Sequence, residues 1–236
     1  MIRPKNDLTR ESSFRYERKF LSQEFDRTTL QAMVKILPGG FNEIYHQRQV
    51  NNIYFDTFDY ENYFDNVDGA PQRKKVRIRW YGEINELVQV PILEVKIKYS
   101  LMGTKLSYPL PSFNVNEYSS NDFLYNLTSQ SNIPRELVTL IKVQQPKLIN
   151  TYSRTYYESV NTKIRITIDD CLSFYDPQKN EIDKNFNIKN MNTILEVKYP
   201  KSSDTIVNQI TSRLPFRLSK SSKYVTGINS VSLLVD

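Results

Sequence analysis

The chain has 236 residues and a formal net charge of +6, with 39% hydrophobic residues, 16 tyrosines and 12 phenylalanines. This length and composition suit one β-rich domain, and we expect a single domain over residues 1–236, with residues 1–13 as a flexible lead-in. No apolar run approaches the roughly 18 residues of a membrane-spanning helix, and the single cysteine excludes an internal disulfide. These features predict a cytoplasmic protein whose partners are anionic.

The most informative stretch is K-V-R-I-R-W at residues 75–80, in which cations alternate with apolar residues. This period of two predicts a β-strand with one basic face and one apolar face. Related patterns follow at 93–98, 163–169 and 195–198, where L-E-V-K occurs twice. The sequence therefore contains a weak internal repeat of strands with a charged face.

The charged strand faces indicate that the protein binds an anionic ligand. Like charges that lie opposite one another on neighbouring strands destabilise a sheet, so stability alone does not explain the pattern. We expect an α+β fold in which an antiparallel sheet closes into a barrel. Its charged faces would line a central channel for a polyanion, and helices would cover the apolar faces outside.

The remaining elements are expected in the following order along the chain. Further strands are predicted at 14–20, 51–57, 105–108, 147–149 and 151–158. Helices are expected to begin near residues that cap or open a first turn, namely Asp26, Asn121 or Asp122, Pro134, and Ser203 or Asp204. Residues 58–71 and 176–190 are predicted loops, residues 218–224 a basic tail, and residues 227–235 a final strand or helix.

The side chains on the charged faces suit phosphate chemistry. Arginine forks match pairs of phosphate oxygens, and lysine adds a compact charge. Carboxylates among these cations fit Mg²⁺ or Mn²⁺, which take oxygen ligands and bridge to phosphates. The sequence has no G-x-x-x-x-G-K-[ST] motif and no Cys/His metal cluster. Side chains, and not a glycine-rich loop, would therefore bind the anion.

A series of short motifs occurs in order along nearly the whole chain. They are R-Y-E-R-K-F at 15–20, I-Y-F-D-T at 53–57, K-V-R-I-R-W-Y at 75–81, L-E-V-K at 93–96, Y-S-R at 152–154, I-R-I-T-I-D at 164–169, L-E-V-K-Y at 195–199 and S-K-Y at 222–224. This set resembles the VTC-type polyphosphate polymerase domain, a branch of the triphosphate tunnel metalloenzyme (CYTH-like) superfamily. Only the order of the whole set is specific, because each motif is short.

The resemblance implies an eight-stranded antiparallel tunnel that transfers the γ-phosphate of ATP to a growing polyphosphate chain. Inorganic phosphate and polyphosphate would be further ligands, and Mn²⁺ or Mg²⁺ the cofactor. The residues expected to act in catalysis are Lys19, Arg77, Arg79, Lys96, Arg165 and Glu196. Those expected to bind phosphates are Lys98, Lys105, Arg154, Lys198 and Lys223, with Lys220 as a competitor for the role of Lys223. The metal would be held by Glu196, assisted by Glu94, Glu17 and Asp169.

Other functions remain open at this point. The wider superfamily begins with E-x-E-x-K, whereas this chain has Arg15 at the first acidic position, which favours the polymerase over a tunnel triphosphatase that uses water as acceptor. A non-catalytic polyphosphate sensor is a third alternative. Nucleic acid is not an expected partner, because the cations occur singly on alternate strand positions. A membrane partner would have to be another polypeptide.

Overall fold

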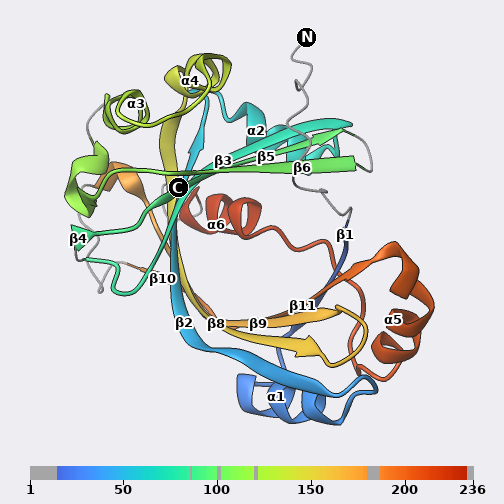
Figure 1. Ribbon diagram of the computed structural model, residues 1–236. Helices are drawn as coiled ribbons and strands as arrows, with labels where there is room; N and C mark the ends of the chain where they lie inside the picture. The colour runs from blue at the N-terminus through green and yellow to red at the C-terminus, as the bar shows by residue number, and fades with distance from the viewer. Residues whose placement is uncertain (1–14, 86, 100–101, 120–121, 180–186, 233–236) are drawn as a thin grey trace.

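The computed structural model describes residues 15–85, 87–99, 102–119, 122–179 and 187–232, and all structural statements below refer to these residues. Its main element is a strongly curved antiparallel sheet with the strand order β1-β11-β9-β8-β2-β3-β5-β6 (Figure 1). These strands are β1 (Arg15–Ser22), β2 (Phe41–Asp56), β3 (Gln72–Tyr81), β5 (Ile92–Tyr99), β6 (Met102–Pro109), β8 (Gln145–Ser159), β9 (Arg165–Tyr175) and β11 (Thr193–Pro200). The short strand β10 (Ile188–Asn190) pairs with β9, and β4 (Leu87–Val88) pairs with β7 (Phe113–Asn114).

Helices lie on both sides of this curved sheet. They are α1 (Arg27–Ile36), α2 (Glu61–Val67), α3 (Phe123–Ser129), α4 (Arg135–Lys142), α5 (Asp204–Thr211) and α6 (Lys223–Ser232). Short 3-10 turns cover Val115–Ser119, Pro177–Lys179 and Lys201–Ser203. In Figure 1, α3 and α4 lie outside one half of the sheet, α1 and α5 lie outside the other half, and α6 lies within the curve. None of the described helices is long and apolar enough to cross a membrane.

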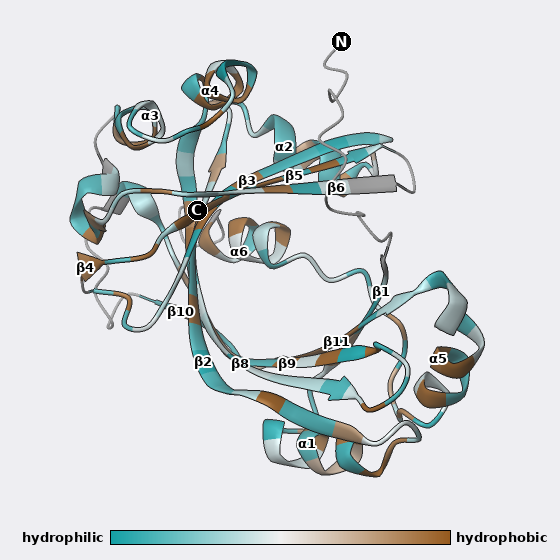
Figure 2. Cartoon of the chain, in the orientation of Figure 1, coloured by the Kyte–Doolittle hydropathy of each residue, from teal (hydrophilic) through white to brown (hydrophobic). Residues whose placement is uncertain are grey.

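The apolar strand faces pack outward, as the alternation predicts. Val76, Ile78 and Trp80 are almost fully buried, in one cluster with Phe123 of α3 and Ile141 of α4. A second cluster joins strands β9 and β11 to helices α1 and α5. Figure 2 shows that helices such as α4 and α5 carry both hydrophobic and hydrophilic residues. Burial of these faces leaves the charged faces inside the curve.

The expected closed barrel is not confirmed. The strand order contains the expected eight-stranded path, but it ends at β1 and β6, and no described residues pair these two strands. The free edge of β1 instead meets the chain before α6, where the backbone N–H of Ser219 donates to the carbonyl of Lys19 at 2.8 Å. Across the gap, Lys96 Nζ of β5 lies 4.0 Å from Glu17 Oε2 of β1. The sheet is therefore open; residues 218–222 lie along the free edge of β1 and reach Lys75 of β3 through Ser222.

Helix α2 falls in the segment predicted as a loop. Its first turn is capped from a distance, because the buried carboxylate of Asp56 accepts from the backbone N–H groups of Asn62 and Tyr63 at 2.9 Å each. The same carboxylate accepts a 2.5 Å hydrogen bond from Tyr224 Oη of α6. Asp56 thus joins the end of β2 to two helices, a role that no local sequence pattern indicates.

Other expected elements are present with altered bounds. The strand predicted at 51–57 is the last part of β2, which starts at Phe41, and the final element is helix α6. β2 and β8 pair along most of their length, with bulges near Tyr45 that bend the sheet. The lead-in at residues 1–13 and residues 233–235 of the expected final element lie outside the described residues.

Helix α6 approaches the sheet at Gly227 more closely than any side chain would permit. A Cβ atom at this position would overlap the side chain of Leu148 and would lie only 2.7 Å from Phe174 Cδ1. We predict that Gly227→Ala lowers the free energy of unfolding by about 1–3 kcal/mol, because the helix must move away from β8 and β9. Urea denaturation of the two proteins measures the difference. Ser230→Ala in the same helix serves as the control, and equal stability of Gly227→Ala and the parent would contradict the close packing.

Candidate functional site

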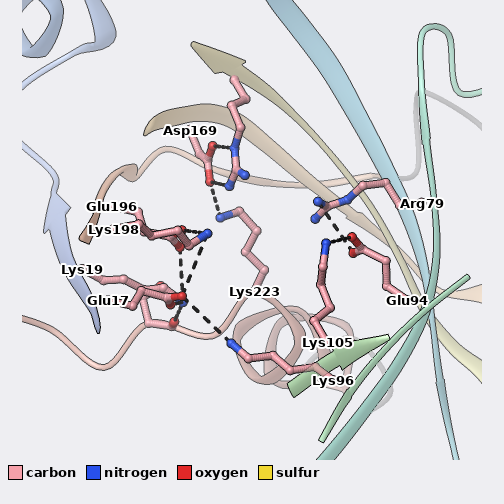
Figure 3. A network of polar contacts seen from close by, with 12 residues as sticks. Glu17, Lys19, Arg79, Glu94, Lys96, Lys105, Asp169, Glu196, Lys198 and Lys223 are labelled. Atoms are coloured by element: carbon pink, nitrogen blue, oxygen red, sulfur yellow. Dashed lines mark hydrogen bonds and ion pairs between the residues drawn. The ribbon is translucent and has the colours of Figure 1, made fainter. Parts of the chain in front are cut away.

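The charged faces of the strands meet inside the curve of the sheet. Strand register places Arg77 opposite Glu94 on β5 and opposite Tyr54 on β2. On the other half of the sheet, Lys19 lies opposite Glu196 and Arg154 lies opposite Asp169. Figure 3 shows that the labelled side chains point towards a common space from both halves. They form three ion-pair clusters, each named here after its most buried carboxylate.

The Glu94 cluster consists of Arg77, Arg79, Glu94 and Lys105 from β3, β5 and β6. Arg77 Nε and Lys105 Nζ lie 2.7 Å and 2.8 Å from the carboxylate of Glu94, and Arg79 Nη1 lies 3.7 Å away. Burial opposes ionisation of Glu94, but the two guanidinium groups and Lys105 hold its pKa far below the ordinary value. The carboxylate is therefore charged at neutral pH and fixes three cations on one wall.

The Asp169 cluster joins the sheet to α6. The carboxylate of Asp169 is fully buried and accepts two hydrogen bonds from Arg154, one of them 2.6 Å from Nη2. Lys223, the first residue of α6, donates to the same carboxylate at 2.5 Å. Burial opposes the charge of Asp169, yet Arg154 and Lys223 lower its pKa. This cluster therefore sets the position of α6 as well as of its own cations.

The Glu196 cluster lies at the gap between the ends of the sheet and consists of Glu17, Lys19, Lys96, Glu196 and Lys198. Lys19 Nζ is 2.8 Å from Glu17 Oε1 and 3.6 Å from Glu196 Oε2, and Lys198 contacts Glu196 Oε1. Burial opposes the charged form of Lys19, but Glu196 and Glu17 raise its pKa. Two carboxylates thus lie close together between two lysines.

Polar residues outside the expected set support these clusters. Arg79 donates to Asn52 Oδ1 at 3.0 Å and to Tyr152 Oη at 3.3 Å. Arg77 donates to Tyr54 Oη at 3.2 Å. Tyr152 could have been inferred from its place two residues before Arg154 on one strand face, whereas no sequence signal marks Asn52.

Lys75 is the missed cation with the most unusual surroundings. Its Nζ donates to Ser222 Oγ at 2.9 Å, and no described carboxylate lies within ion-pair distance of it. Burial, together with the neighbouring charges of Lys19 and Lys96, lowers the pKa of Lys75 to about 7. Lys75 belongs to the alternating residues of β3, so the inward direction of its side chain was predictable. The absence of a carboxylate partner among the described residues was not predictable.

Some expected site residues lie apart from the three clusters. Arg165 is largely exposed and pairs with Glu158 at 3.4 Å, near one end of β9. Lys220 is exposed, and Lys98 lies opposite Arg73 on the neighbouring strand. Geometry therefore favours Lys223 over Lys220 as the cation that reaches the interior.

The four carboxylates expected to bind metal do not meet in one place. Within the described residues no group of three or more histidine, cysteine, aspartate or glutamate side chains is arranged to hold a metal ion. Glu94 and Asp169 are each surrounded by cations, whereas Glu17 and Glu196 are neighbours. Glu196 Oε1 is buried and accepts no hydrogen bond of proper geometry, although Lys198 contacts it. Glu196 with Glu17 is therefore the carboxylate pair whose chemistry fits a hard divalent cation.

The fold and the site define an α+β protein whose antiparallel sheet curves around an interior of buried cations and ionised carboxylates. Residues 14–232 match the VTC domain family. The chain belongs to this family, and the match extends from β1 through α6.

Three solved structures are similar to this one at low sequence identity. The PH1819 protein from Pyrococcus horikoshii OT3 is 12% identical with a TM-score of 0.51, over 94% of this chain and 100% of that chain. A provisionally named adenylate cyclase from Vibrio parahaemolyticus is 12% identical with a TM-score of 0.47, over 91% and 98% of the two chains. One from Bacillus halodurans is 14% identical with a TM-score of 0.48, over 87% and 92%. No curated protein matches the chain significantly.

Lys75 allows a test of the unpaired charge in the interior. Because its pKa is lowered from 10.5 to about 7, the cost of burying its charge is fully present below pH 7 and disappears as the pH rises towards 10.5. We predict that Lys75→Met raises the Tm of the ligand-free protein by about 2–4 °C at pH 6 and by less at pH 9. The same variant should bind inorganic tripolyphosphate more weakly than the parent.

Thermal unfolding at the two pH values and calorimetric titration with tripolyphosphate measure both effects. Lys74→Met is the matched control, because Lys74 is the exposed neighbour on the opposite strand face. A lower Tm for Lys75→Met at pH 6 would show that this charge is not a net cost to the folded state.

Proposed function

We propose that this protein is a polyphosphate polymerase, which transfers the γ-phosphate of ATP to inorganic phosphate or to a growing polyphosphate chain. The observation that carries the proposal is the interior of the sheet, where cations from both halves converge around buried carboxylates in a VTC domain. Arginine and lysine side chains at such a site match the oxygens of a chain of phosphates.

The ion pairs hold the cations ready for substrate. Glu94 fixes Arg77, Arg79 and Lys105 before any phosphate binds, so little reorganisation accompanies binding. Arg154 and Lys223 approach from the other half of the sheet. A triphosphate between these groups would have positive charge on both sides. This charge would stabilise the negative charge that develops during phosphoryl transfer.

The acceptor needs no strong base. A terminal phosphate oxygen is already anionic, so attack on the γ-phosphorus requires alignment and not proton removal. Lys19, Lys96 and Lys198 are the cations of the Glu196 cluster and would position this second anion. Transfer forms one P–O bond to the acceptor, breaks the bond between the γ-phosphorus and the bridging oxygen, and releases ADP.

A divalent cation fits beside Glu196 and Glu17. When bound, Mn²⁺ or Mg²⁺ would supply positive charge to the phosphate oxygens and orient them. The chain's own contribution is the pair of carboxylates. Lys198 and Lys19 hold the pKa of Glu196 well below its usual range despite burial, so this carboxylate stays ionised.

Synthesis of polymer from ATP tests the proposed reaction. We expect the protein with ATP and Mn²⁺ to produce long polyphosphate on a gel, and a chelator to abolish it. Arg77→Ala should lower the rate by about 10²–10³-fold, because it removes one preorganised electrostatic donor. Lys74→Ala, on the outer face of the same strand, should retain the parent rate.

The products distinguish the alternatives. Free phosphate without polymer would indicate a tunnel triphosphatase, with water as the acceptor. Tight polyphosphate binding with no turnover under any divalent ion would indicate a sensor. An Arg77→Ala variant that is as fast as the parent would contradict the assignment of the site itself.

The metal assignment makes a separate prediction. Glu196→Gln removes one carboxylate charge with little change of shape, and we expect it to weaken Mn²⁺ binding by at least about tenfold, because loss even of an outer-shell partner of a metal typically costs about that much. Calorimetric titration with Mn²⁺ in the absence of nucleotide measures this directly. Asp204→Asn, a carboxylate on α5 that pairs with Arg18, is the control. Unchanged Mn²⁺ affinity in Glu196→Gln would place the metal elsewhere.

A further inference from the structure

Arg48 of β2 is held by aromatic rings and by no acid. Its guanidinium carbon lies 4.4 Å from the ring centroid of Tyr45, 5.5 Å from that of Tyr81 and 5.8 Å from that of Tyr156. Among the residues that the structure describes, no carboxylate is within ion-pair distance of Arg48. This arrangement differs from the three ion-pair clusters, in which each arginine contacts a carboxylate.

These residues lie on the same inner face as the clusters. Arg48 is in register with Arg154 on β8, and Tyr45 is in register with Tyr156. Tyr81 follows Arg77 and Arg79 at alternate positions of β3. The guanidinium carbon of Arg154 is 5.9 Å from the Tyr156 ring, so Tyr156 lies between the two arginines. The aromatic group therefore continues directly from the Asp169 cluster.

Along β8 and β3 the aromatic group lies beyond the arginines of the Asp169 and Glu94 clusters, on the side away from α6. Helix α6 packs against Leu148, Tyr152 and Phe174 in one apolar cluster, and Gly227 leaves no free space there. Tyr156 is further along β8 from this contact. A substrate whose phosphates lie between Arg79 and Arg154 would find a helix on one side and the tyrosines on the other.

The rings at this position are open to ligand. Tyr45 is 49% exposed and Tyr81 is 46% exposed, whereas Tyr152, which faces α6, is almost fully buried. The rings of Tyr45 and Tyr156 meet edge to face at 5.5 Å, which constrains the orientation of each ring. Exposed rings beside a planar guanidinium are the surface on which nucleic acid bases stack.

We propose that Tyr45, Arg48, Tyr81 and Tyr156 form a stacking platform for the base of the nucleoside triphosphate donor. The inference rests on the proposed function, because it takes the triphosphate to lie between the charged clusters. It assigns a direction to the substrate: the nucleoside lies at the aromatic group, and the γ-phosphate points towards the lysines of the Glu196 cluster.

The chemistry of the platform also sets its selectivity. Stacking on tyrosine and arginine uses the face of a base, which all bases possess, and not the pattern of hydrogen-bonding groups at its edge. We therefore expect similar affinity for purine nucleotides of different edge chemistry, and a clear distinction between nucleotides and inorganic tripolyphosphate when the platform is altered.

Paired titrations test the platform. The ligands are an ATP analogue with a non-transferable γ-phosphate and inorganic tripolyphosphate, each titrated calorimetrically in Mg²⁺ buffer. We expect Tyr45→Ala and Tyr81→Ala each to weaken the nucleotide analogue by about tenfold, as for loss of one base-stacking contact, and to change tripolyphosphate affinity by less than about twofold. Tyr45→Phe keeps the ring and should bind both ligands as the parent does.

Tyr125→Ala is the matched control, because Tyr125 is also exposed beneath a cation, with Lys142 Nζ 4.7 Å from its ring, but on the outer helix α3. Equal losses of affinity for both ligands in the tyrosine variants, or no loss for either ligand, would overturn the platform.

Parent protein that binds both ligands but makes no polymer would refute the polymerase proposal. The effect of the variants on the ratio of the two affinities would still decide whether the platform exists. Parent protein that binds neither would refute both.

Discussion

Repulsion between cations in a confined interior is the constraint on which this structure depends. Lysines and arginines from two halves of a curved sheet face one another, and each would be costly to bury without an opposite charge nearby. Glu94, Asp169 and Glu196 meet this requirement, since each contacts at least two cations. The carboxylates are therefore part of the architecture as well as of the proposed chemistry, because they offset much of the repulsion among the cations that they contact.

Helix α6 connects this electrostatic requirement to the rest of the fold. Lys223 completes the Asp169 cluster, Ser222 accepts from Lys75, and Tyr224 bonds to the carboxylate of Asp56. Three consecutive residues thus contact three different strands of the sheet. The position of the helix, and with it one end of the interior, is fixed by polar contacts as much as by packing at Gly227.

The sequence predicts which face of the sheet a side chain lies on better than it predicts which side chains of different strands lie close together. Alternation along β3 and β5 placed Arg77, Arg79 and Glu94 inside, because successive side chains of a strand point to opposite faces. Alternation does not define how far apart strands lie around the curve. The carboxylates expected to bind metal consequently do not come together, since Glu94 and Asp169 lie in separate clusters from Glu196. Helix α2 was missed because its cap, Asp56, lies outside the local pattern of a helix start.

The open seam between β1 and β6 gives the interior a property that a closed barrel lacks. In a closed barrel the hydrogen-bond ladder sets the circumference, whereas here an ion pair between Lys96 and Glu17 crosses the gap and residues 218–222 lie along the free edge of β1. A pair 4.0 Å apart with a half-exposed lysine is weak and is screened by salt. No hydrogen-bond ladder between described residues therefore fixes the distance across this seam, and the ion pair that crosses it weakens as the salt concentration rises.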